Sequence, residues 1–310
     1  MIFGINYPWT LFEGRANYGC DFGRNIWNSH NGVSRHVSEV GADFAVMADA
    51  GLQVARWFVF TDGRGGIAWN AAGELTGLDA EFFDDMDAAV DCASGAGMQL
   101  CLVLLDYLWL HDAGRREYVT TEVGRTVFLE RVIDPLLQRY GSAVHSFDVI
   151  NEPDWVTEGL EPNRAHEPIP LDELRHFIRA AAARIHAASP ALVTVGGGRV
   201  KFAAEWDRPE LALDFVQVHS YPDVRYPDRD EVLFGRTAAS FGLSKPLLIG
   251  EHPSNPRLHP DDHLSPAYTL EDYQVLAREG GYLGAWPWSF KGGGAFGDVD
   301  LELMRGLTER

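Results

Sequence analysis

Apolar runs of strand length alternate with amphipathic runs of helix length along the chain. The apolar runs cover residues 2–7, 52–60, 98–105, 144–151, 192–196, 214–219, 246–250 and 282–290. Between them, apolar residues recur with the spacing of helices that bury one face. The pattern therefore predicts eight strand–helix units. Alternating units of this kind form a parallel sheet, and eight of them close it into an α/β (β/α)8 TIM barrel.

Start and stop signals support the predicted helices. Asp79 and Thr121 are expected to be N-caps, and Gly51 and Gly141 are expected to end helices. Pro135 lies inside a predicted helix and is expected to kink it. The predicted helices cover residues 33–50, 80–93, 122–140, 171–188, 230–241, 266–278 and 301–307, with a short one near residue 201.

An open, doubly wound sheet is the competing architecture. No Gly-x-Gly-x-x-Gly motif follows the first predicted strand, which argues against a dinucleotide-binding sheet. Gly196-Gly197-Gly198 is not followed by Gly-Lys-Ser/Thr, so it does not fit a phosphate-binding loop. Composition does not shift along the chain, so we expect a single domain spanning residues 1–310.

The charge balance excludes two classes of partner. The chain has 26 Lys and Arg against 45 Asp and Glu, a formal net charge of −19. Such a surface repels nucleic acid and anionic membranes and suits a neutral ligand better than a polyanion. The sequence does not indicate an oligomeric state.

Neither targeting nor cofactor motifs are recognisable. No basic segment followed by an apolar run precedes the first strand, so we expect a cytoplasmic protein, or a secreted one if a leader was removed. Cys20, Cys92 and Cys101 lack metal-ligand spacing, and we expect no cofactor and no metal. His252, His259 and His263, with Asp261 and Asp262, form one candidate metal set. His259 and His263 have helical ligand spacing, but their Pro-rich surroundings disfavour a helix and therefore a metal site.

Polar residues lie at the ends of the predicted strands, and in a barrel these ends surround one mouth. Glu152 follows the fourth strand and Glu251 follows the seventh, and these strands lie roughly opposite each other. We therefore expect the two carboxylates to face one another across a cleft. Two carboxylates on either side of a bond are the groups that glycoside hydrolysis requires.

Several motifs occur in the same order as in a known group of enzymes. They are Arg56 within Ala-Arg-Trp, Asn151-Glu152-Pro153, His219-Ser220-Tyr221, Glu251, and Trp288-Ser289-Phe290. Together they resemble the clan A glycoside hydrolases, and most closely the family 5-like enzymes that include cellulases and mannanases. The resemblance extends over nearly the whole chain.

The resemblance implies a retaining β-glycosidase of the β-mannoside or β-glucoside type that works by double displacement. It makes Glu152 the acid/base and Glu251 the nucleophile. Asn151 would hold the 2-hydroxyl group of the sugar, and Arg56 would support Glu251. One departure leaves subfamily and substrate open, because many family 5 enzymes carry a His near the end of the third strand, where this chain has Leu105-Asp106-Tyr107.

The remaining predicted site residues contact the catalytic pair or the sugar. By the same resemblance, His219 and Tyr221 would orient the carboxylates, and Trp288 would be a stacking platform. Trp9 is the first of several aromatic residues after the first strand, together with Phe12, Tyr18, Phe22 and Trp27. Aromatic planes suit the apolar faces of pyranose rings, but the same residues are also suited to packing the loop onto the barrel.

Other interpretations stay open. Arg56 fits a structural ion pair, His219 a core histidine, and Asp106 a loop-capping acid. A non-catalytic carbohydrate-binding barrel would use the same aromatic cleft, and it is distinguished by sugar binding without release of reducing ends. A metal-dependent barrel enzyme of another class is distinguished by its sensitivity to chelators.

Overall fold

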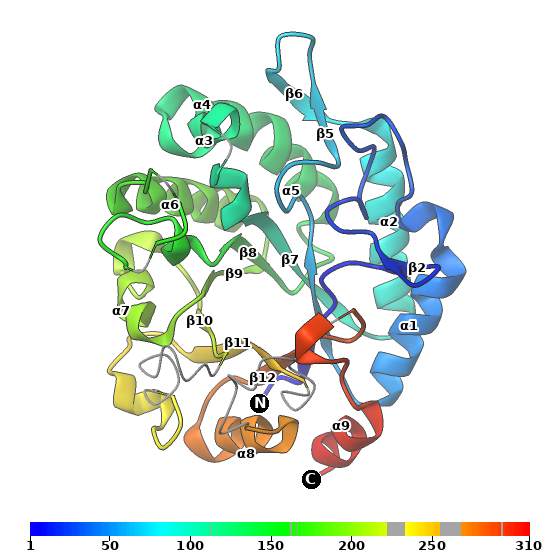
Figure 1. Cartoon of the computed structure of the whole chain (residues 1–310), viewed down its shortest axis with the longest axis vertical. Helices are drawn as coiled ribbons and strands as arrows, with labels where there is room; N and C mark the ends of the chain where they lie inside the picture. Colours follow the sequence, from blue (N-terminus) through cyan, green and yellow to red (C-terminus); the bar gives the residue numbers. More distant parts are fainter. Residues whose placement is uncertain (112, 162, 166, 222–232, 255–267, 293) are drawn as a thin grey trace.

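The computed structural model describes residues 1–111, 113–161, 163–165, 167–221, 233–254, 268–292 and 294–310. Its central feature is an eight-stranded parallel sheet whose neighbours follow the order β1-β4-β7-β8-β9-β10-β11-β12. The strands are β1 (Gly4–Asn6), β4 (Val54–Phe58), β7 (Gln99–Asp106), β8 (Ser146–Asn151), β9 (Leu192–Gly197), β10 (Val216–His219), β11 (Leu247–Pro253) and β12 (Ala285–Trp288). Figure 1 shows these strands as a ring with the helices outside it.

The ring closes where the first and last strands meet. Ile2 N donates to Leu283 O at 2.6 Å, and Phe290 N donates to Asn6 O at 2.9 Å. The side-chain amide of Asn6 donates to Trp286 O at 3.1 Å and to Gly250 O at 2.8 Å. Closure leaves the sheet without an open edge, as the predicted TIM barrel requires.

The outer layer consists mainly of helices. They are α1 (Val37–Asp49), α2 (Ala80–Gly95), α3 (Ala113–Thr120), α4 (Glu122–Phe128), α5 (Asp134–Tyr140), α6 (Leu171–Ala188), α7 (Ala203–Trp206), α8 (Leu270–Gly280) and α9 (Leu301–Thr308). The 3-10 turns are η1 (Val33–Arg35), η2 (Tyr107–His111), η4 (Pro153–Trp155), η5 (Val200–Phe202), η6 (Pro209–Leu211), η7 (Ala238–Phe241) and η9 (Gly294–Phe296). None of the helices in the described ranges combines the length and apolar character needed to cross a bilayer.

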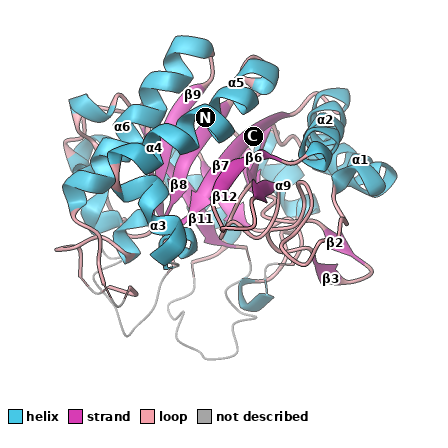
Figure 2. Cartoon of the chain, turned by 90° about the horizontal axis from the view of Figure 1, so that it is seen from above, coloured by secondary structure: helices cyan, strands magenta, loops and turns pink. Residues whose placement is uncertain are grey.

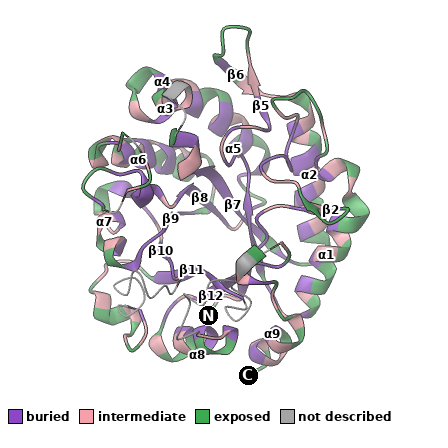
Figure 3. Ribbon diagram, viewed as in Figure 1, coloured by how far each residue is buried: buried purple, intermediate pink, exposed green. Residues whose placement is uncertain are grey.

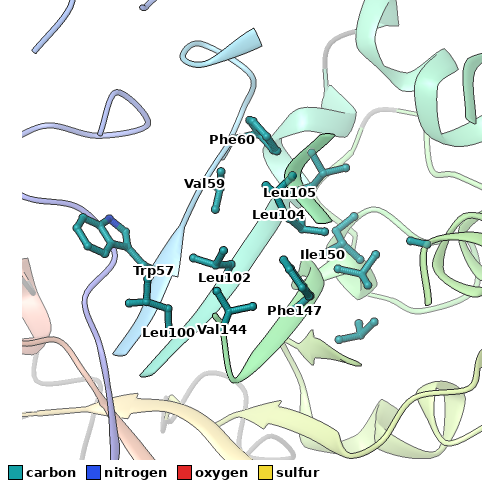
Figure 4. Packing of buried hydrophobic residues seen from close by; sticks show 14 of the residues in the cluster. Trp57, Val59, Phe60, Leu100, Leu102, Leu104, Leu105, Val144, Phe147 and Ile150 are labelled. Carbon is teal, nitrogen blue, oxygen red and sulfur yellow. The ribbon is translucent and has the colours of Figure 1, made fainter. Parts of the chain in front are cut away.

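The main core lies between strands and helices. Figure 3 shows buried residues along the strands and on the inner helix faces, with exposed residues outside. Trp57 of β4, Leu102 of β7 and Phe147 of β8 are fully buried in this layer (Figure 4). On α6, buried residues such as Leu174, Phe177 and Ile178 recur at helical spacing, which places them on one face. Burial of each such side chain contributes about 1.5–3 kcal/mol to stability.

Several predicted boundaries are confirmed. Helix α6 covers residues 171–188 as predicted. Asp79 caps α2 by accepting from Phe82 N at 2.8 Å, and Thr121 caps α4 by accepting from Gly124 N at 3.0 Å. Both caps were predictable because a short polar side chain bonds a nearby backbone N–H that the first helical turn leaves unbonded.

Other boundaries differ from the prediction. The helix expected over residues 122–140 is divided into α4 and α5 by a π-helical turn, η3 (Leu129–Ile133). Pro135 follows this turn directly, and the backbone remains helical through Ile133 and Asp134. Strand β11 continues past Gly250 to Pro253. Residues 233–241 form turns and η7 instead of the predicted helix, whose start at 230 lies outside the described residues, as does the predicted helix start at 266.

The sequence analysis missed three elements. Helix α3 precedes α4, and two hairpins, β2 (Leu11–Phe12) with β3 (Arg15–Ala16) and β5 (Ile67–Trp69) with β6 (Leu75–Leu78), decorate the barrel. Figure 2 shows the β2–β3 hairpin outside the ring of strands, among the loops. The strands of these hairpins are two to four residues long, too short to show a hydrophobic period.

Candidate active site

A cleft of about 310 Å³ opens among the loops that follow the barrel strands. Six of the eight predicted site residues line it: Trp9, Asn151, Glu152, Tyr221, Glu251 and Trp288. The other two, Arg56 and His219, lie beneath the cleft and are 0% and 2% exposed. The fold therefore brings the residues predicted from β1, β4, β8, β10, β11 and β12 to one place.

Glu152 follows the last residue of β8 and adopts a left-handed backbone conformation, with φ at 50°. Its N–H donates to Gly196 O at 2.6 Å, which holds this turn against β9. Its Oε2 accepts from Trp155 Nε1 at 2.8 Å, and its Oε1 lies 2.9 Å from His219 Nδ1. Few non-glycine residues adopt this conformation, so these contacts compensate for the local strain.

Two glycines make space for Glu152 and the polar groups under it. A Cβ atom at Gly198 would lie 2.7 Å from Trp155 Nε1 and 3.1 Å from the Cβ of Glu152. A Cβ atom at Gly196 would lie 3.0 Å from His219 Nε2 and 2.9 Å from a carboxylate oxygen of Asp148. The Gly196-Gly197-Gly198 run therefore allows β9 to approach the polar cluster closely.

Glu251 lies within β11, and both of its carboxylate oxygens accept hydrogen bonds. Arg56 Nη1 donates to Oε1 at 2.6 Å, and the Tyr221 hydroxyl donates to Oε2 at 2.7 Å. The side chain is 5% exposed. Donors of this kind stabilise the charged form of a carboxylate and fix its orientation. Burial, followed by the nearby charge of Glu251, raises the pKa of Tyr221, so the phenol keeps its proton.

Arg56 connects residues from three strands. Its Nη1 donates to Asn6 Oδ1 at 2.9 Å, and its Nη2 donates to Asn151 Oδ1 at 2.7 Å. Its Nε and Nη2 both donate to Asp148 Oδ2, at 3.1 and 2.8 Å. Burial opposes the positive charge, but the carboxylates of Asp148 and Glu251 raise the pKa of Arg56, so the guanidinium stays charged.

Asp148 was missed by the sequence analysis. It is fully buried in β8, and it accepts from Gly196 N at 2.9 Å and from Gln217 Nε2 at 2.7 Å, in addition to Arg56. The signal in the sequence was an acid inside the apolar run Phe147-Asp148-Val149. A buried carboxylate needs hydrogen-bond donors or a cation as partners, so this position indicated a polar cluster inside the barrel.

His219 is a neutral histidine at pH 7. Burial lowers its pKa to about 4, although Glu251 acts in the opposite direction. Its Nδ1 lies 2.9 Å from Glu152 Oε1 and 3.5 Å from Glu251 Oε1. The imidazole therefore lies beside both glutamates, and it orients Glu152 without adding a positive charge.

The two carboxylates face one another closely. An oxygen of Glu152, an oxygen of Glu251 and a ring nitrogen of His219 all lie within 4.8 Å of one another. Groups of this composition also occur as metal ligands, but Arg56 donates to Glu251 and places a positive charge beside it. That charge opposes a divalent cation, so the donor set suits proton transfer better than metal binding.

Aromatic rings surround the carboxylates. The ring of Trp9 lies 5.7 Å from that of Trp288 in an edge-on arrangement and 4.8 Å from that of Tyr18. Across the cleft, the ring of Tyr221 lies 4.7 Å from that of Phe296. Planar rings beside a polar pair form a surface that matches both the apolar faces and the hydroxyl groups of a sugar.

The aromatic loop after β1 divides between the two predicted uses. Trp9 and Tyr18 line the cleft, whereas Phe12 and Phe22 are buried in the core. Trp27 does neither, and 66% of its surface is exposed.

Of the candidate metal histidines, only His252 belongs to the described residues. His259 and His263 lie outside the described residues. His252 is fully buried, stacks on Tyr273 at a ring distance of 4.1 Å and does not line the cleft. Burial lowers its pKa to about 3, so it is a neutral core residue.

Asp106 also belongs to the cleft. It ends β7, lines the cavity, and accepts from Asn151 Nδ2 at 2.7 Å and from Leu108 N at 2.9 Å. Burial raises its pKa to about 7, and its hydrogen bonds act in the opposite direction. The loop-capping contact expected from the sequence is present, together with a contact to the site that was not expected.

Comparisons with known proteins agree with this geometry. No family profile matches the chain. Among curated proteins, the mannan endo-1,4-beta-mannosidase of Cryptopygus antarcticus is 23% identical over 342 residues, which cover 98% of this chain and 84% of that protein. The β-mannanase of the blue mussel Mytilus edulis has a TM-score of 0.78 at 22% identity, covering 100% of this chain and 92% of that one. The endo-1,4-beta-mannanase of Eisenia fetida has a TM-score of 0.79 at 21% identity, covering 99% of this chain and 90% of that one.

The chain has the fold of these mannanases. The predicted single-domain (β/α)8 barrel is thereby confirmed. The resemblance to family 5-like enzymes agrees with these comparisons, since the curated relative is a mannan endo-1,4-beta-mannosidase. An endoglucanase, Cel5A of Thermotoga maritima, shares the fold as well, with a TM-score of 0.61 at 14% identity.

Proposed function

We propose that this barrel is a retaining β-glycoside hydrolase whose substrate is a β-1,4-linked mannan or mannooligosaccharide. The observation that carries the proposal is the pair formed by Glu152 and Glu251, whose facing oxygens lie within 4.8 Å inside an aromatic cleft. Retaining glycosidases place their carboxyl groups about 5–5.5 Å apart, whereas inverting enzymes need about 6.5–9.5 Å to admit a water molecule. The mannanase relatives support the choice of sugar.

In this proposal the barrel of residues 1–310 is the catalytic domain, and Glu251 is the nucleophile. Arg56 and Tyr221 hold its two oxygens in place and stabilise the negative charge that attacks the anomeric carbon. The attack forms a covalent bond between that carbon and Glu251, and it breaks the glycosidic bond.

Glu152 is the proposed acid/base. It gives its proton to the departing oxygen in the first step and takes a proton from water in the second, when water releases the sugar from Glu251. Trp155 and His219 hold its two oxygens, which fixes the direction of proton transfer. In this proposal Asn151 binds a sugar hydroxyl, and Trp9 and Trp288 stack on the sugar ring; all three line the cleft, which supports these roles.

The test measures kcat on mannan, mannooligosaccharides and aryl β-mannosides for Glu251→Ala and Glu152→Gln. Each variant is expected to lose nearly all turnover. Glu130→Gln is the matched control, because Glu130 is an exposed glutamate on η3, and it is expected to keep wild-type activity. Wild-type kcat in both site variants would disprove the proposal.

Azide separates the two roles. With azide, Glu251→Gly is expected to form a glycosyl azide whose anomeric configuration is inverted relative to the substrate, because azide replaces the nucleophile. An azide product of retained configuration from this variant would assign the acid/base role to Glu251 and overturn the order of roles. Binding of mannooligosaccharides by the wild-type protein without release of reducing ends would favour a carbohydrate-binding barrel.

A further inference from the structure

Asp106 is a buried acid in the cleft that has no role in the proposed chemistry. It is 5% exposed, ends β7 and lines the same cleft as Glu152 and Glu251. Its Oδ1 accepts from Leu108 N at 2.9 Å, and its Oδ2 accepts from Asn151 Nδ2 at 2.7 Å. The contact with Leu108 alone would explain a capping residue, but the contact with Asn151 links the carboxylate to the candidate active site.

Asn151 is held from both sides of its amide group. Arg56 Nη2 donates to Oδ1 at 2.7 Å, while Asp106 Oδ2 accepts from Nδ2. A flipped amide would turn its NH2 group toward the guanidinium, which only donates, and its oxygen toward Asp106, so the contact with Arg56 would become repulsive, as would that with the ionised Asp106. The donor on one side and the acceptor on the other therefore fix one orientation.

The fixed orientation leaves one amide hydrogen for a ligand. Nδ2 carries two hydrogens, and Asp106 takes one of them. Asn151 lines the cleft, and within the described part of the chain Asp106 is the only acceptor that its Nδ2 contacts. The neighbouring strands hold the arrangement rigidly, since Asp106 and Asn151 are partners in the register between β7 and β8.

We propose that Asp106 is a positioning residue for glycoside hydrolysis, holding the amide of Asn151 so that its second N–H bonds a sugar hydroxyl beside the two glutamates. This inference rests on the proposed function and extends it to a residue that departs from the family pattern. Asp106 acts through Asn151. It uses Oδ2 for this contact, because Oδ1 accepts from Leu108 N.

The test compares an aryl β-glycoside that the wild-type protein hydrolyses with its 2-deoxy analogue, after correction for spontaneous hydrolysis. In the wild-type protein, loss of the 2-hydroxyl is expected to lower kcat/KM by about tenfold or more, mainly through kcat, because this hydrogen bond strengthens in the transition state. In Asp106→Ala the same change is expected to cost less than about threefold, because the amide of Asn151 is no longer held toward the hydroxyl.

Asp106→Asn gives a second variant of the same shape. Its single side-chain oxygen replaces two acceptors, so it keeps the contact with either Leu108 or Asn151 but not both, and an intermediate penalty is expected. Asp79→Ala is the matched control, because Asp79 likewise accepts two N–H bonds, both from the backbone of Arg24 and Phe82, and does not line the cleft. The control is expected to lose stability while keeping the wild-type 2-deoxy penalty.

The outcomes separate the two proposals. A wild-type protein that hydrolyses no glycoside overturns the proposed function and this inference with it. An active wild-type protein whose 2-deoxy penalty is unchanged in both Asp106 variants overturns the role of Asp106 alone. If Asp106→Ala does not fold, the ratio of kcat/KM between the glycoside and its 2-deoxy analogue in Asp106→Asn tests the role of Asp106.

Discussion

Replacement of Asp148 by alanine is the sharpest test of how the barrel holds its polar centre. The carboxylate is 0% exposed and accepts from Arg56, Gln217 and Gly196. The Asp148→Ala variant leaves the Gln217 amide and the Gly196 N–H without these acceptors. It also removes one of the two carboxylates that neutralise the buried guanidinium of Arg56, and leaves only Glu251.

The expected loss of stability is large. Removing one partner of a buried ion pair costs about 3–5 kcal/mol. Unfolding entropy is about 2.1 cal/mol/K per residue, so for 310 residues the melting temperature is expected to fall by about 5–8 °C. Activity is expected to fall as well, because Asn151 and Glu251 lose the fixed guanidinium that positions them.

The assay is thermal and urea unfolding of the wild-type protein, Asp148→Ala and Asp134→Ala. The control breaks the ion pair between Asp134 and Arg184, whose side chains are 39% and 41% exposed. Surface pairs contribute about 0–1 kcal/mol, so the control is expected to melt within about 2 °C of the wild-type protein. If Asp148→Ala is no less stable than Asp134→Ala, the buried contacts of Asp148 do not contribute the expected ~3–5 kcal/mol to stability.

Two further predictions concern protons. Tyr221→Phe removes the hydroxyl that donates to Glu251 at 2.7 Å, and kcat is expected to fall about 10–100-fold, since hydrogen bonds to charged groups contribute about 1.5–3 kcal/mol; an unchanged kcat would contradict this role. His252 has a pKa of about 3 when folded, so between about pH 6.5 and pH 3 the unfolded chain binds a proton that the folded chain does not. The stability of the wild-type protein relative to His252→Gln is therefore expected to fall by about 2–3 kcal/mol from pH 7 to pH 4.5 in urea titrations, and a constant difference would contradict the low pKa.

Much of the barrel was predictable because its signals are local. The apolar period of residues 171–188 and the cap at Asp79 each depend on neighbours within one element. The meeting of Glu152 and Glu251 was also predictable, since in a barrel the ends of all strands surround one mouth.

The parts that were not predicted depend on contacts between distant residues. Asp148 meets Gln217 and Arg56 only after three strands have paired, and no local pattern says which cation a buried acid will find. The π-helical turn before Pro135 is an exception, because it lies within one element and hydrophobic spacing does not specify it. The contact of Asp106 with Asn151 depends on the register between β7 and β8, and the sequence alone does not specify that register.

The amide of Asn6 has a consequence for the order of assembly. It donates to Gly250 and Trp286 near the seam between the first and last strands, and its oxygen accepts from the guanidinium that contacts Glu251. A chain that lacks its final strand β12 does not offer the Asn6 amide the acceptor Trp286 O. We therefore expect a chain that lacks β12 to hold the Asn6 amide, and through it Arg56 and Glu251, less firmly than the closed barrel does.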